Sequence, residues 1–145
     1  DLSKNTVKNA KALGAALASE GFDVLAESRG YTASHQVLTR HGSLDSGAGA
    51  KAADLLEQAG IITNMNMLPG DTKAMSPSGL RLGAQELTRV GMGVDEMKDV
   101  ARFYSRVLID KEDPSSVKSD VKEFKSEYQT IRYCFNEDEL SGYPL

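Results

Sequence analysis

Hydrophobic positions along the chain recur at spacings that switch between helical and strand-like. Apolar residues three and four positions apart predict helices, and alternating apolar and polar residues predict strands with one buried face. On this basis we expect helices over residues 4–20, 48–58, 94–109 and from 113 onward. We expect strands over residues 22–27, 34–40, 61–68 and 78–83. This order predicts an α/β (α+β) two-layer sandwich, in which a small, largely antiparallel sheet packs against helices.

The strongest helix signals lie in the second half of the chain. Residues 94–109 place their apolar positions on one helical face, made of Met97, Val100, Ala101, Tyr104 and Leu108. Asp113 followed by Pro114 is typical of a helix start, because aspartate caps free backbone N–H groups and proline fits the first turn. We therefore expect two helices after the last strand.

Arg81 is the most informative polar residue, because it stands between two leucines in the last expected strand. Side chains alternate across a strand, so Leu80 and Leu82 should point into the core and Arg81 away from it. Gly79 and Gly83 flank this triplet and leave room for a ligand. A guanidinium matches a carboxylate in two parallel hydrogen bonds, so we interpret Arg81 as a carboxylate clamp rather than a solvated charge. The pattern alone favours the alternative, an ion pair with an Asp or Glu of the same fold.

Four segments of the chain, in order, carry the motifs of one enzyme family. They are NAKALGAALASEGFDVL (9–25), TASHQVL (32–38), AGIITNMNMLP (59–69), and SGLRLG with the ELTR and GMG that follow it (78–93). Together they resemble the C-terminal part of serine hydroxymethyltransferase, a pyridoxal-phosphate enzyme of fold type I. The resemblance implies that Arg81 binds the α-carboxylate of the amino-acid substrate.

Asn64 and Asn66 lie two residues apart in the sequence TNMNM and should share one strand face. Two amides on one face offer paired donors and acceptors, which suits the mixed edge of a heterocycle. The alternative is that they satisfy nearby loop backbone. The resemblance implies that Asn66 contacts the pterin ring of the cosubstrate, with Asn64 in a supporting role.

The loop before Arg81 departs from the bacterial and eukaryotic form of the family. Those enzymes carry Ser-Pro-Phe a few residues before the Ser-Gly-x-Arg core, whereas MSPSGLR (75–81) places Pro77 directly before Ser78 and lacks the Phe. The loop and residues 120–135 are similar to the archaeal branch, whose members can use tetrahydromethanopterin in place of tetrahydrofolate. The pterin is thus open between these two.

The family's Schiff-base lysine has no counterpart here, because neither Lys51 nor Lys73 has the Thr-rich setting with a neighbouring His. Asp1 is not an initiator methionine. We therefore expect residues 1–145 to be a single C-terminal small domain, with a core over 1–112 and a helix and tail over 113–145. The large domain that binds pyridoxal phosphate would be absent from this chain, which by itself would be inactive.

Composition narrows the remaining possibilities. The 145 residues contain 40% hydrophobic residues and no apolar run of transmembrane length, and we expect no membrane partner. The net charge of −4, scattered Lys and Arg and the lack of Trp argue against nucleic acid. The one cysteine, Cys134, suits a reducing cytoplasm and should be a buried or half-buried thiol rather than a nucleophile. The acidic run 136–139 is typical of a solvated tail.

Three further motifs invite chemistry that their surroundings do not support. His35 and His41 have no ligand-spaced partners, so we expect no metal; His35 would be structural or stand behind the site. SGAGAK (46–51) lacks the spacing of a phosphate loop and should be a helix start. Arg89 should pair with Glu86, three residues earlier.

The resemblance implies a homodimeric enzyme that interconverts L-serine and glycine and passes the hydroxymethyl carbon to a reduced pterin. Two alternatives stay open. One is the small domain of another fold type I enzyme, a threonine aldolase or an aminotransferase, which also carries a carboxylate-binding arginine. The other is a non-catalytic α/β ligand-binding module.

Overall fold

The computed structural model describes residues 2–134, so the acidic run 136–139 lies outside the described residues. The helices are α1 (Leu2–Ser19), α2 (Ala48–Gln58), α3 (Gln85–Arg89), α4 (Glu96–Leu108) and α5 (Pro114–Ser126), with a short 3-10 helix at Glu27–Arg29. The strands are β1 (Asp23–Val24), β2 (Gln36–Arg40), β3 (Asn64–Asn66) and β4 (Gly79–Gly83). Among the described residues, no helix is long and apolar enough to cross a membrane.

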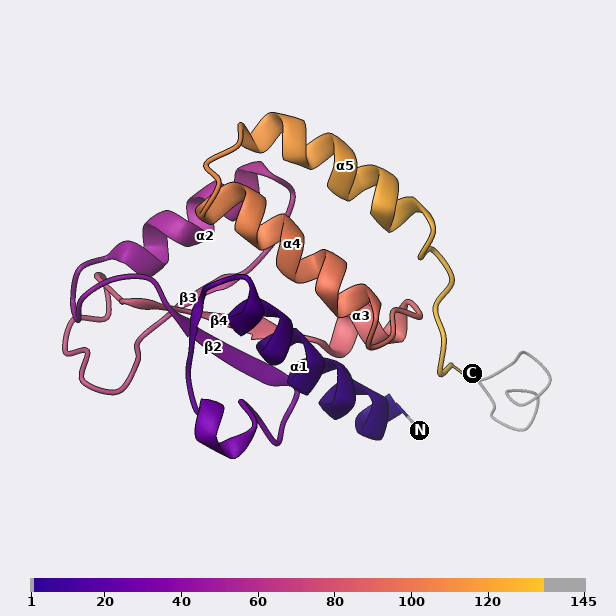
Figure 1. Ribbon diagram of the computed structural model, residues 1–145, viewed down its shortest axis with the longest axis horizontal. Coiled ribbons are helices and arrows are strands. Elements are labelled where there is room, and N and C mark those ends of the chain that lie inside the picture. Colours follow the sequence, from indigo (N-terminus) through magenta and orange to yellow (C-terminus); the bar gives the residue numbers. More distant parts are fainter. Residues whose placement is uncertain (1, 135–145) are drawn as a thin grey trace, which may run out of the picture.

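The four strands form one antiparallel sheet in the order β1-β2-β4-β3. The helices gather on one side of this sheet, with α5 outermost (Figure 1). Leu80 and Leu82 of β4 are buried beneath them, in one core with Leu13 of α1 and Met97 of α4. The predicted fold class, a small antiparallel sheet packed against helices, is confirmed.

Two arginines of α4 hold the helices around it. Arg102 forms ion pairs with Glu20 at 3.3 Å and Asp110 at 2.9 Å. Arg106 pairs with Glu112 at 2.8 Å and with Asp120 of α5 at 2.7 Å. The position of α5 against α4 is therefore set by charge as well as by apolar packing.

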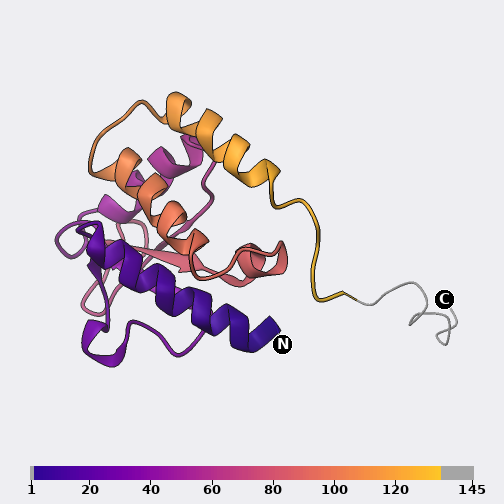
Figure 2. The same cartoon turned by 45° about the vertical axis from the view of Figure 1, so that its right-hand side comes forward.

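The segment after α5 returns along the helical layer toward the start of α1 (Figure 2). The backbone N–H of Arg132 donates to the carbonyl of Arg89 over 2.7 Å. The amide of Asn5 donates to the Tyr133 hydroxyl over 2.8 Å. These two hydrogen bonds hold the last described part of the chain against α3 and α1.

The structure corrects several predicted boundaries. The strand expected over 22–27 contains only β1, because Ala26 has a φ of 61° and turns the chain into the 3-10 helix. The strand expected over 61–68 is reduced to β3. The helix α3 was not predicted, since five residues are too short for a periodic pattern. By contrast α2 has the predicted bounds, and α5 begins after Asp113, whose carboxylate accepts from the N–H of Ser115 at 3.4 Å.

His41 gives the fold a pH dependence. Burial lowers its pKa to about 4, against a smaller opposing effect of Asp23, and Lys111 lowers it further. Its Nε2 lies 2.8 Å from the Thr39 hydroxyl. The unfolded chain therefore binds a proton near pH 6.5 that the folded chain accepts only near pH 4.

We expect the free energy of unfolding to fall as the pH drops from about 6.5 to 4. Urea unfolding followed across this range should show the fall in the parent chain and a much smaller one in His41→Gln. His35→Gln, at an exposed histidine, is the matched control and should keep the fall. An unchanged pH dependence in His41→Gln would contradict this assignment.

Candidate functional site

The sheet face that points away from the helices carries the predicted site residues. In β4, Arg81 points opposite to its buried neighbours and is paired in register with Leu38 of β2 and Asn64 of β3. Asn66, two residues further along β3, is paired with Gly79. Because residues two apart share a face, Arg81, Asn64 and Asn66 project from the same side of neighbouring strands.

The glycines on either side of Arg81 are closely packed against neighbouring side chains. A Cβ on Gly79 would lie within 2.7 Å of a Leu68 methyl carbon. A Cβ on Gly83 would lie 3.0 Å from the amide nitrogen of Gln85, whose side chain folds back over the strand. Leu68 and the Gln85 amide thus occupy the space beside the arginine.

The Arg81 side chain is exposed and makes no hydrogen bond or ion pair with the residues that the structure describes. The alternative drawn from the pattern, an ion pair within the fold, is therefore not found in residues 2–134. The interpretation of Arg81 as a carboxylate clamp stays a prediction, and an exposed side chain without a partner in residues 2–134 is compatible with it. A free guanidinium keeps all of its donors available to an anion.

A cavity of about 100 Å³ opens beside Arg81. Its lining brings together residues from both neighbouring strands and from the start of α3, namely His35, Gln36, Asn64, Leu82, Gly83 and Gln85. The guanidinium is the one permanent positive charge in this lining, and amides supply further donors and acceptors. The cavity is suited to a small anion such as a carboxylate.

Three lining residues were not predicted as ligand contacts. His35 was expected to be structural or to stand behind the site, whereas it is exposed and lines the cavity. Gln36 had no distinguishing sequence signal. Gln85 was missed because it belongs to α3, which the sequence did not predict. The one feature that could have indicated Gln85 is its position two residues after the SGLRLG strand.

The two asparagines differ in what they have available. The Asn66 side-chain NH₂ donates to the carbonyl of Met67 over 2.6 Å, which is the local backbone role considered as the alternative. Its side-chain oxygen stays available. The Asn64 side chain is exposed and has no hydrogen-bond partner within residues 2–134. Asn64 therefore offers the freer amide, although the resemblance gave it the lesser role.

A carboxylate network anchors the loop that leads into β4. Asp71 accepts hydrogen bonds from the N–H of Asp45 at 2.7 Å and of Leu68 at 2.8 Å, and from both the N–H and the hydroxyl of Ser78 at 3.0 and 2.8 Å. Removal from water tends to raise the pKa of Asp71, but these four hydrogen bonds outweigh it and hold the pKa well below its usual range. Ser78 directly precedes β4, so the network determines where the strand begins.

Asp45 completes the network from the other loop. Its carboxylate accepts from the Thr72 hydroxyl at 2.7 Å and from the N–H groups of Thr72 and Lys73 at 2.7 and 2.8 Å. These bonds lower the pKa of Asp45, the Thr72 hydroxyl most of all. The loop over 69–77, predicted to be irregular, is therefore held by two ionised side chains.

Helix α2 fixes the same strand from the helical side. A Cβ on Gly49 would lie 2.8 Å from the backbone nitrogen of Gly79. Glycine is needed here because a backbone cannot move aside as a flexible side chain can. The SGAGAK segment thus supplies a helix start that packs on β4, and no phosphate loop.

Comparison with known proteins gives a consistent result. The family model for serine hydroxymethyltransferase matches residues 1–104. The chain belongs to the serine hydroxymethyltransferase family. It is 57% identical over 141 residues to the serine hydroxymethyltransferase of Thermococcus kodakarensis, covering 96% of this chain and 32% of that protein. The serine hydroxymethyltransferase of Methanocella arvoryzae is 53% identical over 134 residues, covering 91% and 31%.

A solved structure agrees with the fold. The crystal structure of L-threonine transaldolase from Pseudomonas fluorescens, in its internal aldimine state, superposes with a TM-score of 0.81 at 30% identity. It covers 96% of this chain and 32% of that one. The chain therefore spans about a third of the length of the serine hydroxymethyltransferases and of the transaldolase that it matches.

The residues around Arg81 do not include what pyridoxal phosphate needs for its Schiff base. No lysine lines the cavity. Within residues 2–134 no group of His, Cys, Asp and Glu could hold a metal ion. Cys134 is exposed, so the expectation of a buried or half-buried thiol is wrong. The Glu86–Arg89 ion pair predicted from spacing is present at 3.9 Å.

Asp71→Asn should lower the urea midpoint of unfolding at pH 7. The amide would place an NH₂ group against backbone N–H groups that donate hydrogen bonds to the carboxylate. A group whose folded-state pKa is depressed stabilises the fold above its unfolded pKa, near 3.9, and loses this effect as the pH falls further. The difference between parent and variant should therefore be largest above about pH 4 and shrink below it. Asp54→Asn, at an exposed carboxylate of α2, is the control. Equal midpoints for the Asp71 and Asp54 variants at pH 7 would argue against the network.

Proposed function

We propose that this chain is the C-terminal small domain of a serine hydroxymethyltransferase, and that Arg81 binds the carboxylate of serine and glycine. The observation that carries the proposal is an exposed, unpaired guanidinium beside a cavity of about 100 Å³ on the open face of the sheet. A bidentate arginine–carboxylate contact fixes the orientation of an amino acid as well as its affinity. Orientation matters here, because the bond to be broken at Cα must be aligned for reaction.

The whole protein would interconvert serine and glycine and transfer one carbon to a reduced pterin. Pyridoxal phosphate, held mainly by a large domain, supplies the electron sink when bound. In this proposal residues 1–112 form the core of the small domain, and 113–145 add a helix and tail. We also propose a homodimer, and a cytoplasmic location that fits the single cysteine.

The pterin site would include Asn66 and Asn64. Both lie on the face of Arg81, Asn64 directly beside it across the strand pair. The free amide of Asn64 and the free oxygen of Asn66 offer a donor and acceptors to one ring edge. The shortened loop around Pro77 and the archaeal relatives favour tetrahydromethanopterin over tetrahydrofolate.

The percentage of identical residues favours this proposal over its alternatives. The serine hydroxymethyltransferases share 53–57% of aligned residues with this chain and the threonine transaldolase 30%. The same matches make a self-contained ligand-binding module the weaker explanation. A rate that depends on pterin remains the direct test between the two enzyme classes.

Arg81→Lys in the full-length protein should lower kcat/KM for serine about 10- to 100-fold. A lysine cannot form both bonds of the fork, and a hydrogen bond to a charged group contributes roughly 1.5 to 3 kcal/mol. Arg40→Lys is the matched control, since Arg40 lies on the same face and pairs with Asp23 at 3.3 Å. Steady-state kinetics with near-normal values for Arg81→Lys would remove this residue from the site.

Asn64→Ala and Asn66→Ala should each raise KM for the pterin about 10-fold. Asn66→Ala should leave serine binding, followed by the change in the visible spectrum, nearly unchanged, because Asn66 does not line the cavity beside Arg81. Gln58→Ala, an exposed amide at the end of α2, is the control.

Initial rates of the parent protein with the two pterins should be higher with tetrahydromethanopterin. Equal rates with tetrahydrofolate would overturn the pterin assignment and leave the role of Arg81 intact.

A further inference from the structure

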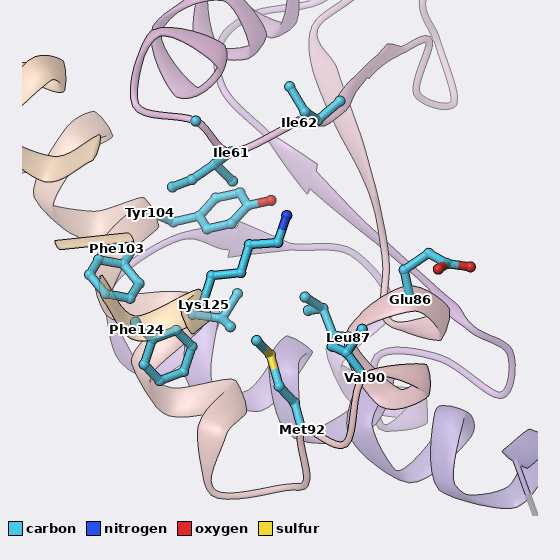
Figure 3. Close-up of a pocket in the computed structure, with 12 residues that line it drawn as sticks. Ile61, Ile62, Glu86, Leu87, Val90, Met92, Phe103, Tyr104, Phe124 and Lys125 are labelled. Atoms are coloured by element: carbon cyan, nitrogen blue, oxygen red, sulfur yellow. The ribbon is translucent and has the colours of Figure 1, made fainter. Parts of the chain in front are cut away.

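A second, larger cavity lies on the helical side of the molecule. It has a volume of about 380 Å³ and opens between α3, α4, α5 and residues 60–62 (Figure 3). This is within the range of roughly 300 to 1,000 Å³ that is usual for small-molecule sites. The wall is largely apolar, with Ile61, Leu87, Val100, Phe103 and Phe124 among its residues. It shares no residue with the lining of the cavity beside Arg81.

Tyr104 places a hydroxyl in this apolar cavity. The residue is only 6% exposed, and its sequence position on the inner face of α4 was predicted. The hydroxyl has no hydrogen-bond partner among residues 2–134. Burial raises the pKa of Tyr104 above its usual value, so the hydroxyl stays protonated and can donate. The hydroxyl is directed into the cavity, where a ligand could reach it (Figure 3).

Lys125 adds a positive charge to the same cavity. Its alkyl stem crosses the opening, and its ammonium group lies on the side to which the Tyr104 hydroxyl points (Figure 3). No carboxylate within residues 2–134 forms an ion pair with it. Glu86 is the one acidic residue of the lining; it pairs with Arg89 and points away from the cavity in Figure 3. The cavity thus has one apolar wall and one end with two donors, one of them charged.

We propose that this cavity binds a small monocarboxylate with an apolar or aromatic body. The carboxylate would accept hydrogen bonds from the Tyr104 hydroxyl and the Lys125 ammonium group. The body would lie against Leu87, Val100 and Phe124. The charge of the ligand follows from complementarity with Lys125, and its single charge from the absence of a second cation in the lining. The lining includes residues of α3, which follows β4 in the chain. A ligand bound in this cavity would therefore also affect the position of the end of β4, the strand that carries Arg81.

The test is isothermal titration of the full-length protein with 3-phenylpropionate, and with its neutral amide as the matched probe. We expect 3-phenylpropionate to bind saturably, with one molecule per chain. The amide should bind at least about 10-fold more weakly. Tyr104→Phe and Lys125→Gln should each weaken carboxylate binding about 10-fold, because each removes a hydrogen bond to a charged group. Lys122→Gln, at an exposed lysine of the same helix outside the lining, should bind as the parent does.

Val100→Phe should fill the cavity and abolish binding. The two polar variants keep the proposal testable if this variant does not fold. The proposal is overturned if 3-phenylpropionate does not bind saturably. It is also overturned if the amide binds as tightly as the acid, or if Tyr104→Phe and Lys125→Gln both bind like the parent.

Discussion

Strand β4 is paired on both sides, and the rest of the structure depends on this pairing. Its register with β2 and β3 places Leu80 and Leu82 under the helices and Arg81 on the opposite face. A slip of one residue would bury the guanidinium and expose the leucines, which is costly in both directions. The apolar core and the orientation of the candidate site are therefore two results of one register.

That register is held from three directions. The Asp45–Asp71 network holds Ser78, the residue directly before β4. Gly49 brings the first turn of α2 against the Gly79 backbone, where no side chain would fit. The carbonyl of His35 accepts from the N–H of Ala84 at 3.0 Å just after the strand ends. Polar contacts at both ends and a close approach in between leave the central arginine little freedom in its backbone, while its side chain stays unpaired.

The two faces of the sheet use polar groups differently. On the open face, free donors surround a small cavity, as expected for a surface that recognises a charged ligand. On the helical face, buried polar groups are mostly satisfied: the Asn9 amide donates to the Thr88 hydroxyl and the Met92 carbonyl, each at 2.9 Å. The hydroxyl of Tyr104 also lacks a partner among residues 2–134, and it faces the cavity between the helices.

Sequence alone determined the features that depend on local spacing. Alternation along residues 78–83 placed Arg81 opposite the buried leucines. Helical periodicity predicted α2, and Asp113 followed by Pro114 predicted the start of α5. Tertiary structure decided the rest, because it depends on residues far apart in the chain. Only packing shows that Arg81 has no ion-pair partner in the described residues, that His35 and Gln85 line its cavity, and that β1 and β3 are short. Periodicity assigned Tyr104 to the core correctly, but whether its hydroxyl finds a partner is set by the distances between α3, α4 and α5, which no local pattern encodes.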